Sequence, residues 1–217
     1  MKKILITGSH GFLARHTAYL LKKKHYKIHG IGNGKWTKKQ YKKWGYNYLI
    51  NGKVNLNNLL KYFNKFDYVV HCAGSGTVGL SSQEDFKKNI IPIKSVLKFV
   101  KLKSPNSKII FLSSYSVYGN NYINPIKENF KTKPTSQYAI NKKIAEDLCL
   151  YYSKKYKINI LIVRAASLYG DGLEKQLIFD ACFKISNRNY NFFGTGKEIR
   201  DFIHISDMTN FIYFSVK

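Results

Sequence analysis

Short apolar runs alternate with longer amphipathic stretches from the N-terminus to Arg164, and this alternation limits the folds open to the chain. The apolar runs predict strands at residues 3–7, 27–32, 47–50, 67–72, 108–113 and 159–163, and the amphipathic stretches predict helices at 12–24, 84–103 and 135–155. Strands and helices that alternate in this way build a parallel sheet with helices on both faces. We therefore predict an α/β fold with a doubly wound parallel sheet. Pro92 should kink the second helix or mark its late start.

The alternation ends after Arg164, where loops, one helical stretch at residues 173–185 and short aromatic segments follow. We interpret residues 1–165 as one domain and residues 166–217 as part of a second, smaller lobe. Neither internal repeats nor a low-complexity linker separates the two parts.

The chain is strongly basic, with 37 Lys and Arg against 12 Asp and Glu and a formal net charge of +25. Such a charge attracts nucleic acids or anionic membranes when it is clustered. Here the lysines are dispersed along the sequence without a nucleic-acid-binding motif, so we predict neither partner. No apolar stretch has the length of a membrane span or of an export signal, and we expect a cytoplasmic protein.

The three cysteines, Cys72, Cys149 and Cys182, are far apart in the sequence and odd in number. This spacing favours neither a metal knuckle nor a disulfide framework. We predict buried free thiols and no metal.

A loop with two glycines, at residues 8–14, joins the first predicted strand to the first predicted helix. Gly8 permits a tight turn, Gly11 lets the backbone approach a pyrophosphate, and Ala14 is small enough for close helix–strand packing. The free amides at the helix N-terminus favour phosphate groups. The loop therefore predicts a dinucleotide site. The expected contact residues are Gly8, His10, Gly11, Phe12 and Leu13.

The second predicted strand ends with Ile31-Gly32-Asn33-Gly34-Lys35, without the acidic residue that usually binds the adenosine ribose at such sites. A glycine at position 32 leaves room for a 2′-phosphate, and Lys35 or Lys38 would neutralise its charge. Alternatively, Asn33 binds the ribose and Lys35 is one more surface lysine. The expected cofactor is NAD or NADP, with a preference for NADP.

Tyr-x-x-x-Lys occurs four times, at Tyr19/Lys23, Tyr138/Lys142, Tyr151/Lys155 and Tyr213/Lys217. The spacing places both side chains on one helix face. There the ammonium lowers the pKa of the phenol and makes it a usable acid or base. The motif is too short to select one pair by itself, so its place among other motifs has to decide.

Further motifs stand in a fixed order around Tyr138/Lys142. They are the glycine loop, His71-Cys72-Ala73-Gly74, Ser113-Ser114-Tyr115-Ser116-Val117-Tyr118-Gly119, Leu168-Tyr169-Gly170, Gly194-Thr195-Gly196 and Arg200-Asp201-Phe202-Ile203-His204. Over residues 1–207 this order resembles that of the extended short-chain dehydrogenases/reductases, the family of nucleotide-sugar epimerases, dehydratases and reductases.

The resemblance implies a Rossmann-type NAD(P)-binding domain at 1–165, a partial substrate-binding lobe at 166–217 and a set of site residues. The implied catalytic residues are Ser114, Tyr138 and Lys142. The implied cofactor contacts are the glycine loop, Asn33, Lys35, Cys72, Ala73, Gly74, Tyr138 and Lys142. The implied contacts with a nucleotide-diphosphate sugar are Ser114, Tyr115 and Arg200. For Arg200, a surface ion pair with Asp201 is the alternative. The oligomeric state stays open, with a homodimer as one option.

The expected chemistry is proton transfer at a sugar hydroxyl or ketone, coupled to hydride transfer by the cofactor. Tyr138 would move the proton. Lys142 would supply charge and hold the nicotinamide ribose, while Ser114 would orient the reacting oxygen.

Two departures from the family pattern narrow this prediction. Tyr115 and Ser116 stand where the family's 4,6-dehydratases carry an Asp-Glu pair, which argues against dehydration and leaves epimerisation and ketone reduction open. The chain ends at Lys217, soon after the Arg200 segment, so we expect a shortened substrate lobe and an incomplete sugar pocket. The alternative is a cofactor-binding but catalytically inactive truncated member of the family.

Overall fold

The computed structural model describes residues 1–75, 80–120, 125–192 and 194–217, and its centre is a six-stranded sheet in the order β3-β2-β1-β4-β5-β6. The strands are β1 (Lys3–Thr7), β2 (Lys27–Gly32), β3 (Tyr48–Asn51), β4 (Tyr68–His71), β5 (Lys108–Ser114) and β6 (Ile160–Ala165). All neighbouring pairs in this sheet are parallel. The predicted doubly wound parallel sheet is thus confirmed.

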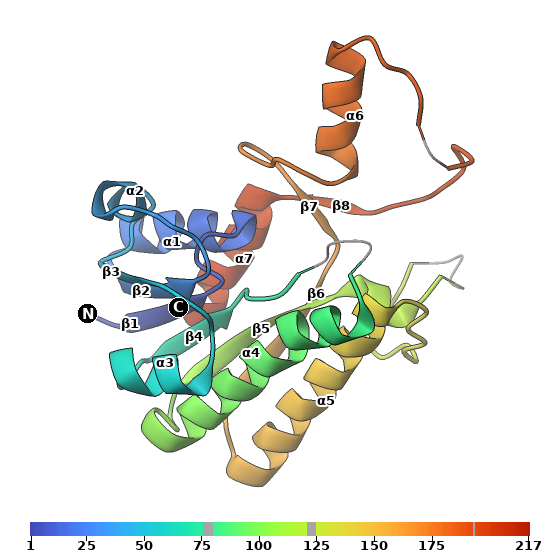
Figure 1. Ribbon diagram of the computed structural model, residues 1–217. Helices are drawn as coiled ribbons and strands as arrows, with labels where there is room; N and C mark the ends of the chain where they lie inside the picture. Colours follow the sequence, from blue (N-terminus) through green and yellow to red (C-terminus); the bar gives the residue numbers. More distant parts are fainter. Residues whose placement is uncertain (76–79, 121–124, 193) are drawn as a thin grey trace.

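Helices cover both faces of the sheet (Figure 1). One face carries α3 (Leu56–Tyr62), α4 (Ser82–Lys103) and α5 (Gln137–Tyr156), whose apolar side chains share one core cluster with the sheet. The other face carries α1 (Phe12–Lys23) and α7 (Ile205–Val216), which share the second cluster. The remaining helices are α2 (Lys38–Lys43), the single turn η1 (Tyr115–Tyr118) and α6 (Leu177–Ser186).

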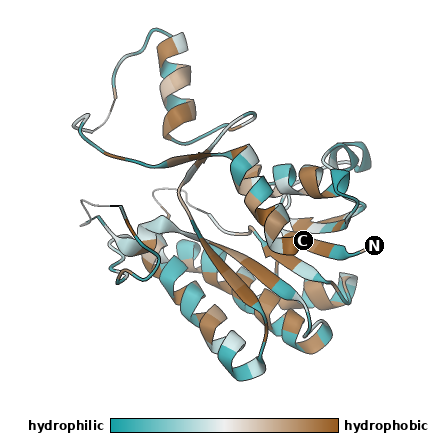
Figure 2. Cartoon of the chain, turned by 180° about the vertical axis from the view of Figure 1, so that it is seen from behind, coloured by the Kyte–Doolittle hydropathy of each residue, from teal (hydrophilic) through white to brown (hydrophobic). Residues whose placement is uncertain are grey.

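The strands are apolar on both sides because helices bury both faces. In β1, Leu5 packs in the core that contains α4, whereas Ile4 and Ile6 pack in the core that contains α1, and all three are fully buried. Figure 2 shows the strands as mostly hydrophobic ribbons. This explains why they read in the sequence as unbroken apolar runs rather than as alternating ones.

Local capping fixes the starts of the two long helices. Ser81 and Glu84 form a reciprocal capping box before α4, and the Ser136 side chain accepts a hydrogen bond from the amide of Ala139 in α5. The predicted effect of Pro92 on the helix start is wrong, because α4 begins at Ser82 and continues through Pro92. The proline removes one backbone hydrogen bond. The apolar residues that follow it, Ile93 among them, are buried against the sheet and hold the helix in place.

Residues 166–217 divide between two places. The strands β7 (Ser167–Tyr169) and β8 (Phe202–His204) form a separate parallel pair, and α6 projects away from the main sheet in both ribbon views. By contrast, Met208, Ile212 and Val216 of α7 belong to the core of the sheet. The predicted division at residue 165 stays a prediction, and any separate lobe excludes α7.

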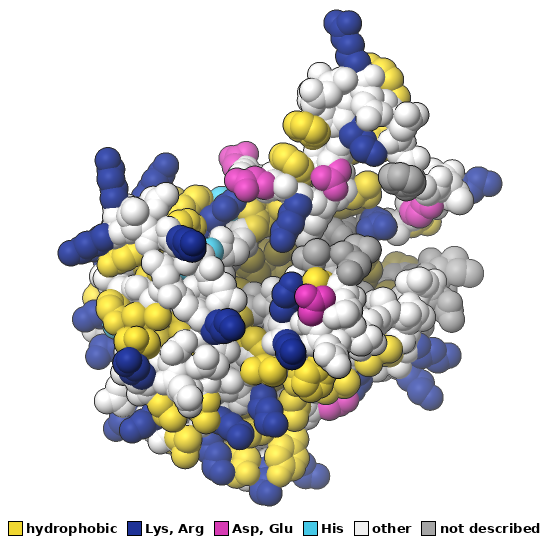
Figure 3. Space-filling view, viewed as in Figure 1, with side chains coloured by type: hydrophobic (Ala, Val, Ile, Leu, Met, Phe, Trp, Pro, Cys, Tyr) yellow, Lys and Arg dark blue, Asp and Glu magenta, His cyan; other side chains and the backbone are white. Residues whose placement is uncertain are grey.

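The surface is basic without a dominant basic patch on the face shown in Figure 3, where Lys and Arg side chains are scattered. Within the described part of the chain, no helix combines the length and apolarity that crossing a membrane requires. All three cysteines are free, but only Cys149 is fully buried. Cys72 is half-buried and Cys182 is exposed on α6, so the prediction of buried thiols is wrong for Cys182, whose helix lies outside the main core.

Candidate functional site

The loops after β1 and β4 meet where the strand order of the sheet reverses. Gly8 follows β1 with φ +72°, and a Cβ atom on it would lie 2.7 Å from the backbone nitrogen of Ala73 and 2.8 Å from its Cα atom. Only glycine therefore allows the two loops to touch. In open parallel sheets, ligands bind in the crevice at such a reversal.

The first turn of α1 is left open for an anion. Gly11 is the N-cap residue, no side chain hydrogen-bonds the cap, and the turn carries no acidic residue. Phe12 and Leu13 supply the next amides of this turn. Unsatisfied helix amides at a glycine cradle suit the pyrophosphate of a dinucleotide, so the residues present fit the expected group.

His10 organises the loop after β2. Its Nδ1 accepts a hydrogen bond from the amide of Gly34 at 3.1 Å, and its Nε2 lies 3.0 Å from Oδ1 of Asn51. Because Nδ1 accepts, Nε2 carries the proton and donates. A Cβ on Gly32 would lie 2.7 Å from His10 Nδ1, so the imidazole itself accounts for the glycine at this position. Asn33 and Lys35 are exposed on the same loop.

Three side chains converge at the C-terminal ends of β4 and β5. Ser114 is the last residue of β5, and its hydroxyl accepts hydrogen bonds from the amide and the hydroxyl of Ser116 at 3.2 and 2.9 Å. The Ser114 hydroxyl also interacts with the Tyr138 phenol and lowers its pKa. Lys142, one turn further along α5, lies with Nζ 5.8 Å from the centre of the Tyr138 ring. The structure thus brings together the three predicted catalytic residues.

Lys142 is buried, and its ammonium points at the end of the sheet. Nζ donates to the carbonyl oxygen of Leu112 at 2.8 Å and lies 5.2 Å from the centre of the Phe111 ring. A Cβ on Gly74 would lie 3.4 Å from Nζ, so the loop after β4 passes directly by. Burial lowers the pKa of Lys142 to about 8, although Cys72 and Asp85 oppose this effect.

The pKa of Tyr138 is raised, which is opposite to the direction predicted from the Tyr-x-x-x-Lys spacing. Burial is the main cause, and the charge of Asp85 adds to it, while the interaction with Ser114 lowers the pKa. Lys142 directs its ammonium to the carbonyl oxygen of Leu112. Desolvation dominates because a buried phenolate loses the solvation that water provides.

A second cluster below the site fixes β5, β6 and α5 to one another. Glu146 is 1% exposed and accepts hydrogen bonds from Arg164 Nε at 3.0 Å, from Arg164 Nη2 at 2.8 Å and from the Ser113 hydroxyl at 2.6 Å. Arg164 Nη1 donates to the hydroxyl of Tyr118 at 2.7 Å. The cluster therefore supports the strand end that carries Ser114.

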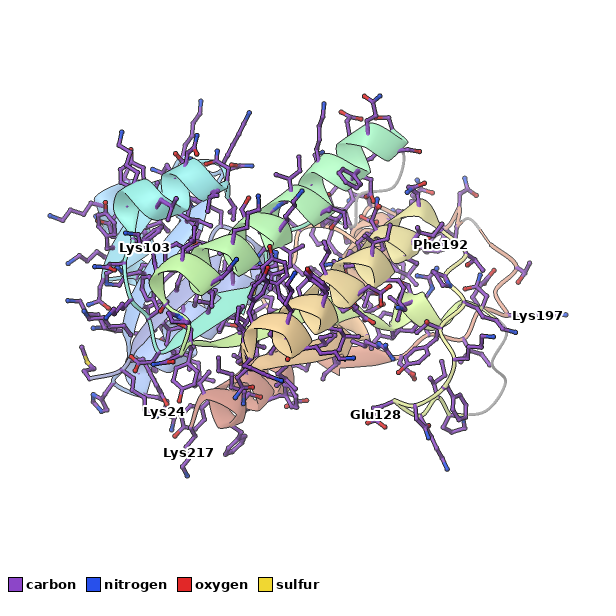
Figure 4. The ribbon with its side chains drawn as sticks, turned by 90° about the horizontal axis from the view of Figure 1, so that it is seen from below. Lys24, Lys103, Glu128, Phe192, Lys197 and Lys217 are labelled. Atoms are coloured by element: carbon purple, nitrogen blue, oxygen red, sulfur yellow. The ribbon has the colours of Figure 1, made fainter. Side chains whose placement is uncertain are left out.

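A third cluster joins α4 to α5 and was not found from the sequence. The carboxylate of Asp85 accepts hydrogen bonds from the side-chain amides of Asn89 and Asn141, at 3.0 and 2.6 Å. Asn89 also binds the backbone of Ser75 through both its side-chain atoms. Figure 4 shows α4 and α5 side by side. Asn141 lies inside the motif 138–142 on α5. This polar residue next to Lys142 was the one feature of the sequence that could have indicated the cluster.

Within the described part of the chain, Arg200 forms no ion pair that would connect it to this site. It is exposed in the segment between α6 and β8, and the alternative pair with Asp201 does not form. Lys197 of the same segment lies at the periphery of the view in Figure 4. Tyr115 is half-buried in η1, next to Ser114.

Known proteins resemble this chain in sequence and in fold. The model of the NAD dependent epimerase/dehydratase family matches residues 4–217. A dTDP-D-glucose 4,6-dehydratase of Dictyostelium discoideum is 30% identical over 97% of this chain and 54% of its own length. A UDP-glucuronate 4-epimerase of Arabidopsis thaliana is 28% identical over 77% of this chain and 40% of its own. The chain thus spans about half the length of these curated relatives.

Among solved structures, a UDP-glucuronic acid 4-epimerase from Bacillus cereus, in complex with UDP-glucuronic acid and NAD, is similar with a TM-score of 0.84. It is 26% identical, and the match covers 99% of this chain and 73% of that one. The match of the family model to nearly the whole chain bears out the resemblance found in the order of the sequence motifs. The chain belongs to the NAD-dependent epimerase/dehydratase family, within the extended short-chain dehydrogenases/reductases.

Proposed function

We propose that the chain carries the catalytic site of an NAD-dependent epimerase acting on a nucleoside-diphosphate sugar. The observation that supports this most is the convergence of Ser114, Tyr138 and Lys142 beside the Gly8 and Gly74 loops. These loops fit a dinucleotide, and the convergent hydroxyls fit a sugar oxygen. The relatives named above include UDP-glucuronate 4-epimerases, which supports the substrate class.

Each side chain has one role in this proposal. After Tyr138 has lost its own proton to solvent, its phenolate oxygen takes the proton of a sugar hydroxyl and returns it later. The Ser114 hydroxyl fixes the orientation of the sugar oxygen. The Lys142 ammonium would hold the ribose of the cofactor and would supply positive charge beside the phenolate. The bound cofactor supplies hydride transfer. Phe12 and Leu13 would hold its pyrophosphate through backbone amides, while Gly8 and Gly11, whose amides donate to the carbonyl oxygens of Ile31 and Gly8, keep the loop open for it.

Dehydration is the main competing reaction, because a relative at 30% identity is a 4,6-dehydratase. Loss of water from a sugar needs an acid and a base beside the reacting carbons. Positions 115 and 116 hold tyrosine and serine, and η1 places both next to Ser114. The Ser116 hydroxyl is already engaged with Ser114. These residues favour epimerisation or ketone reduction over dehydration.

NAD is the proposed cofactor. The expectation of NADP depended on Gly32, and the close approach of the His10 ring accounts for that glycine without a 2′-phosphate. Solved relatives contain NAD. The preference is measured by displacement: NADH is bound first, and NAD or NADP is then added while the fluorescence of bound NADH is recorded. NAD should displace NADH at a lower concentration than NADP does.

Product analysis tests the proposed function. The protein is incubated with NAD and, in separate reactions, UDP-glucose, UDP-glucuronic acid and dTDP-glucose. An epimeric sugar formed without net production of NADH supports the proposal. A product that has lost water would contradict the epimerase proposal and identify the activity as that of a dehydratase.

Gly8→Ala is expected to abolish NAD binding and to destabilise the fold. The new methyl group would overlap the backbone at Ala73, and φ +72° disfavours alanine. The expected loss of unfolding free energy is about 2–3 kcal/mol. Gly52→Ala is the matched control, because its nearest neighbour would lie 3.5 Å away, at ordinary contact distance. Thermal unfolding with and without NAD measures both effects, and a Gly8→Ala protein that NAD still stabilises would contradict the loop assignment.

A cofactor-binding protein without turnover is the second candidate. Its support is the apolar exposure around α6, where Phe183 is 60% exposed and Tyr190 is 69% exposed, and the exposed position of Arg200. Tight NAD binding without conversion of any of the sugar nucleotides would favour this candidate.

A further inference from the structure

Asp85 is a buried carboxylate that forms no ion pair with the residues the structure describes. It lies in the first turn of α4 and is 4% exposed. The ion pairs in the described part of the chain are Lys143–Asp147 and Arg164–Glu146, so Asp85 takes part in none. Its hydrogen-bond donors are the neutral amides of Asn89 and Asn141. A buried charge held only by neutral groups is costly, and such groups concentrate at functional sites.

Among the residues described, Asp85 is the one negatively charged group near Lys142 that has no cationic partner of its own. On α5, Glu146 is bound by Arg164, and burial raises the pKa of the Cys149 thiol, which therefore stays protonated. On the β4 side, burial raises the pKa of Cys72 to about 12 and lowers that of His71 to about 3, so both are neutral near pH 7. Tyr138 is neutral as well, because burial raises its pKa. Among the residues described, only α4 therefore supplies a negative charge without a cationic partner near Lys142.

The two hydrogen bonds of Asp85 connect it to two segments that adjoin Lys142. Asn141 directly precedes Lys142 on α5 and ties that turn to α4 at 2.6 Å. Asn89, bound to the other carboxylate oxygen, holds the backbone of Ser75 at 3.2 and 3.1 Å. A Cβ on Gly74 would lie 2.8 Å from Oδ1 of Asn89 and 3.4 Å from Nζ of Lys142. One carboxylate thus sets the spacing between α4, α5 and the loop after β4.

We propose that Asp85 is a positioning residue that holds the α5 turn of Tyr138 and Lys142 against α4 through Asn141, and whose negative charge keeps the buried Lys142 protonated. The inference rests on the proposed function in taking Lys142 as a working group. Burial lowers the pKa of Lys142 to about 8, and Cys72 and then Asp85 raise it. Because the Cys72 thiol is neutral near pH 7, the full negative charge that remains is that of Asp85. Without this charge, Lys142 loses its proton at a lower pH, so less of it is an ammonium at neutral pH.

The charge role is tested without any substrate. Lysine labelled with carbon-13 next to Nζ is titrated by NMR, and the signal missing in Lys142→Met identifies Lys142. The parent should titrate near pH 8. Asp85→Asn should titrate at lower pH, whereas Asp147→Asn should match the parent, because Asp147 lies on the exposed side of the same helix with its side chain 57% exposed. Equal midpoints in Asp85→Asn and the parent would overturn the proposal; if Asp85→Asn does not fold, Asp85→Ser provides the same comparison.

The positioning role is tested on turnover. Asn141→Ala keeps the carboxylate but releases the turn, so kcat should fall about tenfold while KM changes less than about twofold. In Asp85→Asn the alkaline limb of the kcat profile should move to lower pH, because Lys142 deprotonates earlier. A parent-like kcat in Asn141→Ala would refute the positioning role. A parent without turnover on any sugar nucleotide would refute the proposed function instead, and the NMR titration would still decide the role of Asp85.

Discussion

Replacement of Tyr138 by phenylalanine is expected to lower kcat about a thousandfold, because the variant has no group that takes the proton of the sugar hydroxyl. NAD binding should stay within about twofold of the parent, since the pyrophosphate and ribose contacts assigned above come from other residues. Steady-state turnover and the fluorescence of bound NADH measure the two quantities separately. Turnover equal to the parent would remove Tyr138 from the mechanism.

Tyr151→Phe is the matched control, on the same helix and with the same spacing to a lysine. Lys155 donates to the Tyr151 hydroxyl at 2.8 Å, and this pair is exposed to solvent. We expect turnover within about twofold of the parent. A large loss in Tyr151→Phe would show that the effect of such substitutions on α5 is structural rather than chemical.

Replacement of Glu146 by alanine is expected to lower the free energy of unfolding by about 3–5 kcal/mol. The substitution leaves the Arg164 guanidinium without its two carboxylate bonds and the Ser113 hydroxyl without its acceptor, next to the buried end of β5. Urea unfolding followed by circular dichroism measures the change. A decrease in unfolding free energy below about 1 kcal/mol would show that the cluster contributes little to the packing of α5 on the sheet.

Asp147→Ala is the control for this measurement, since it removes the next acidic residue on α5. Asp147 pairs with Lys143 at the surface, with its side chain 57% exposed. Exposed ion pairs of this kind contribute about 0.3–0.5 kcal/mol. The two carboxylates differ in burial and partners, so the contrast between the variants isolates the buried network.

The Tyr-x-x-x-Lys pairs illustrate how far spacing alone can predict chemistry. At the exposed pair Tyr151/Lys155, the hydrogen bond from the lysine lowers the pKa of the tyrosine, as the spacing predicts. At the buried pair Tyr138/Lys142, burial raises the pKa of the tyrosine and lowers that of the lysine. The order of the neighbouring motifs selected Tyr138/Lys142 in the sequence, and the catalytic role of this pair stays a prediction. The protonation behaviour of that pair depends on desolvation, which only packing determines.

Secondary structure shows the same limit. The strands and the long helices were predictable because their apolar spacing persists over many residues. The short helices α2 and α3 were missed, and α2 buries none of its residues, so it has no apolar pattern to detect. Its start is fixed instead by a capping box between Thr37 and Gln40. For Pro92, local geometry predicted a disturbed start, and burial of the following residues against the sheet prevailed.

By itself, the sequence determined the doubly wound sheet, the glycine loop between β1 and α1, and the order of motifs that gives the family. These features depend on periodicity and turn chemistry within a few residues. The tertiary structure alone decided that His10 fills the space over Gly32, that Glu146 binds Arg164, and that Asp85 faces Lys142 from α4. Such pairings join residues far apart in the chain, and their energies depend on which groups lose water together when the helices pack on the sheet.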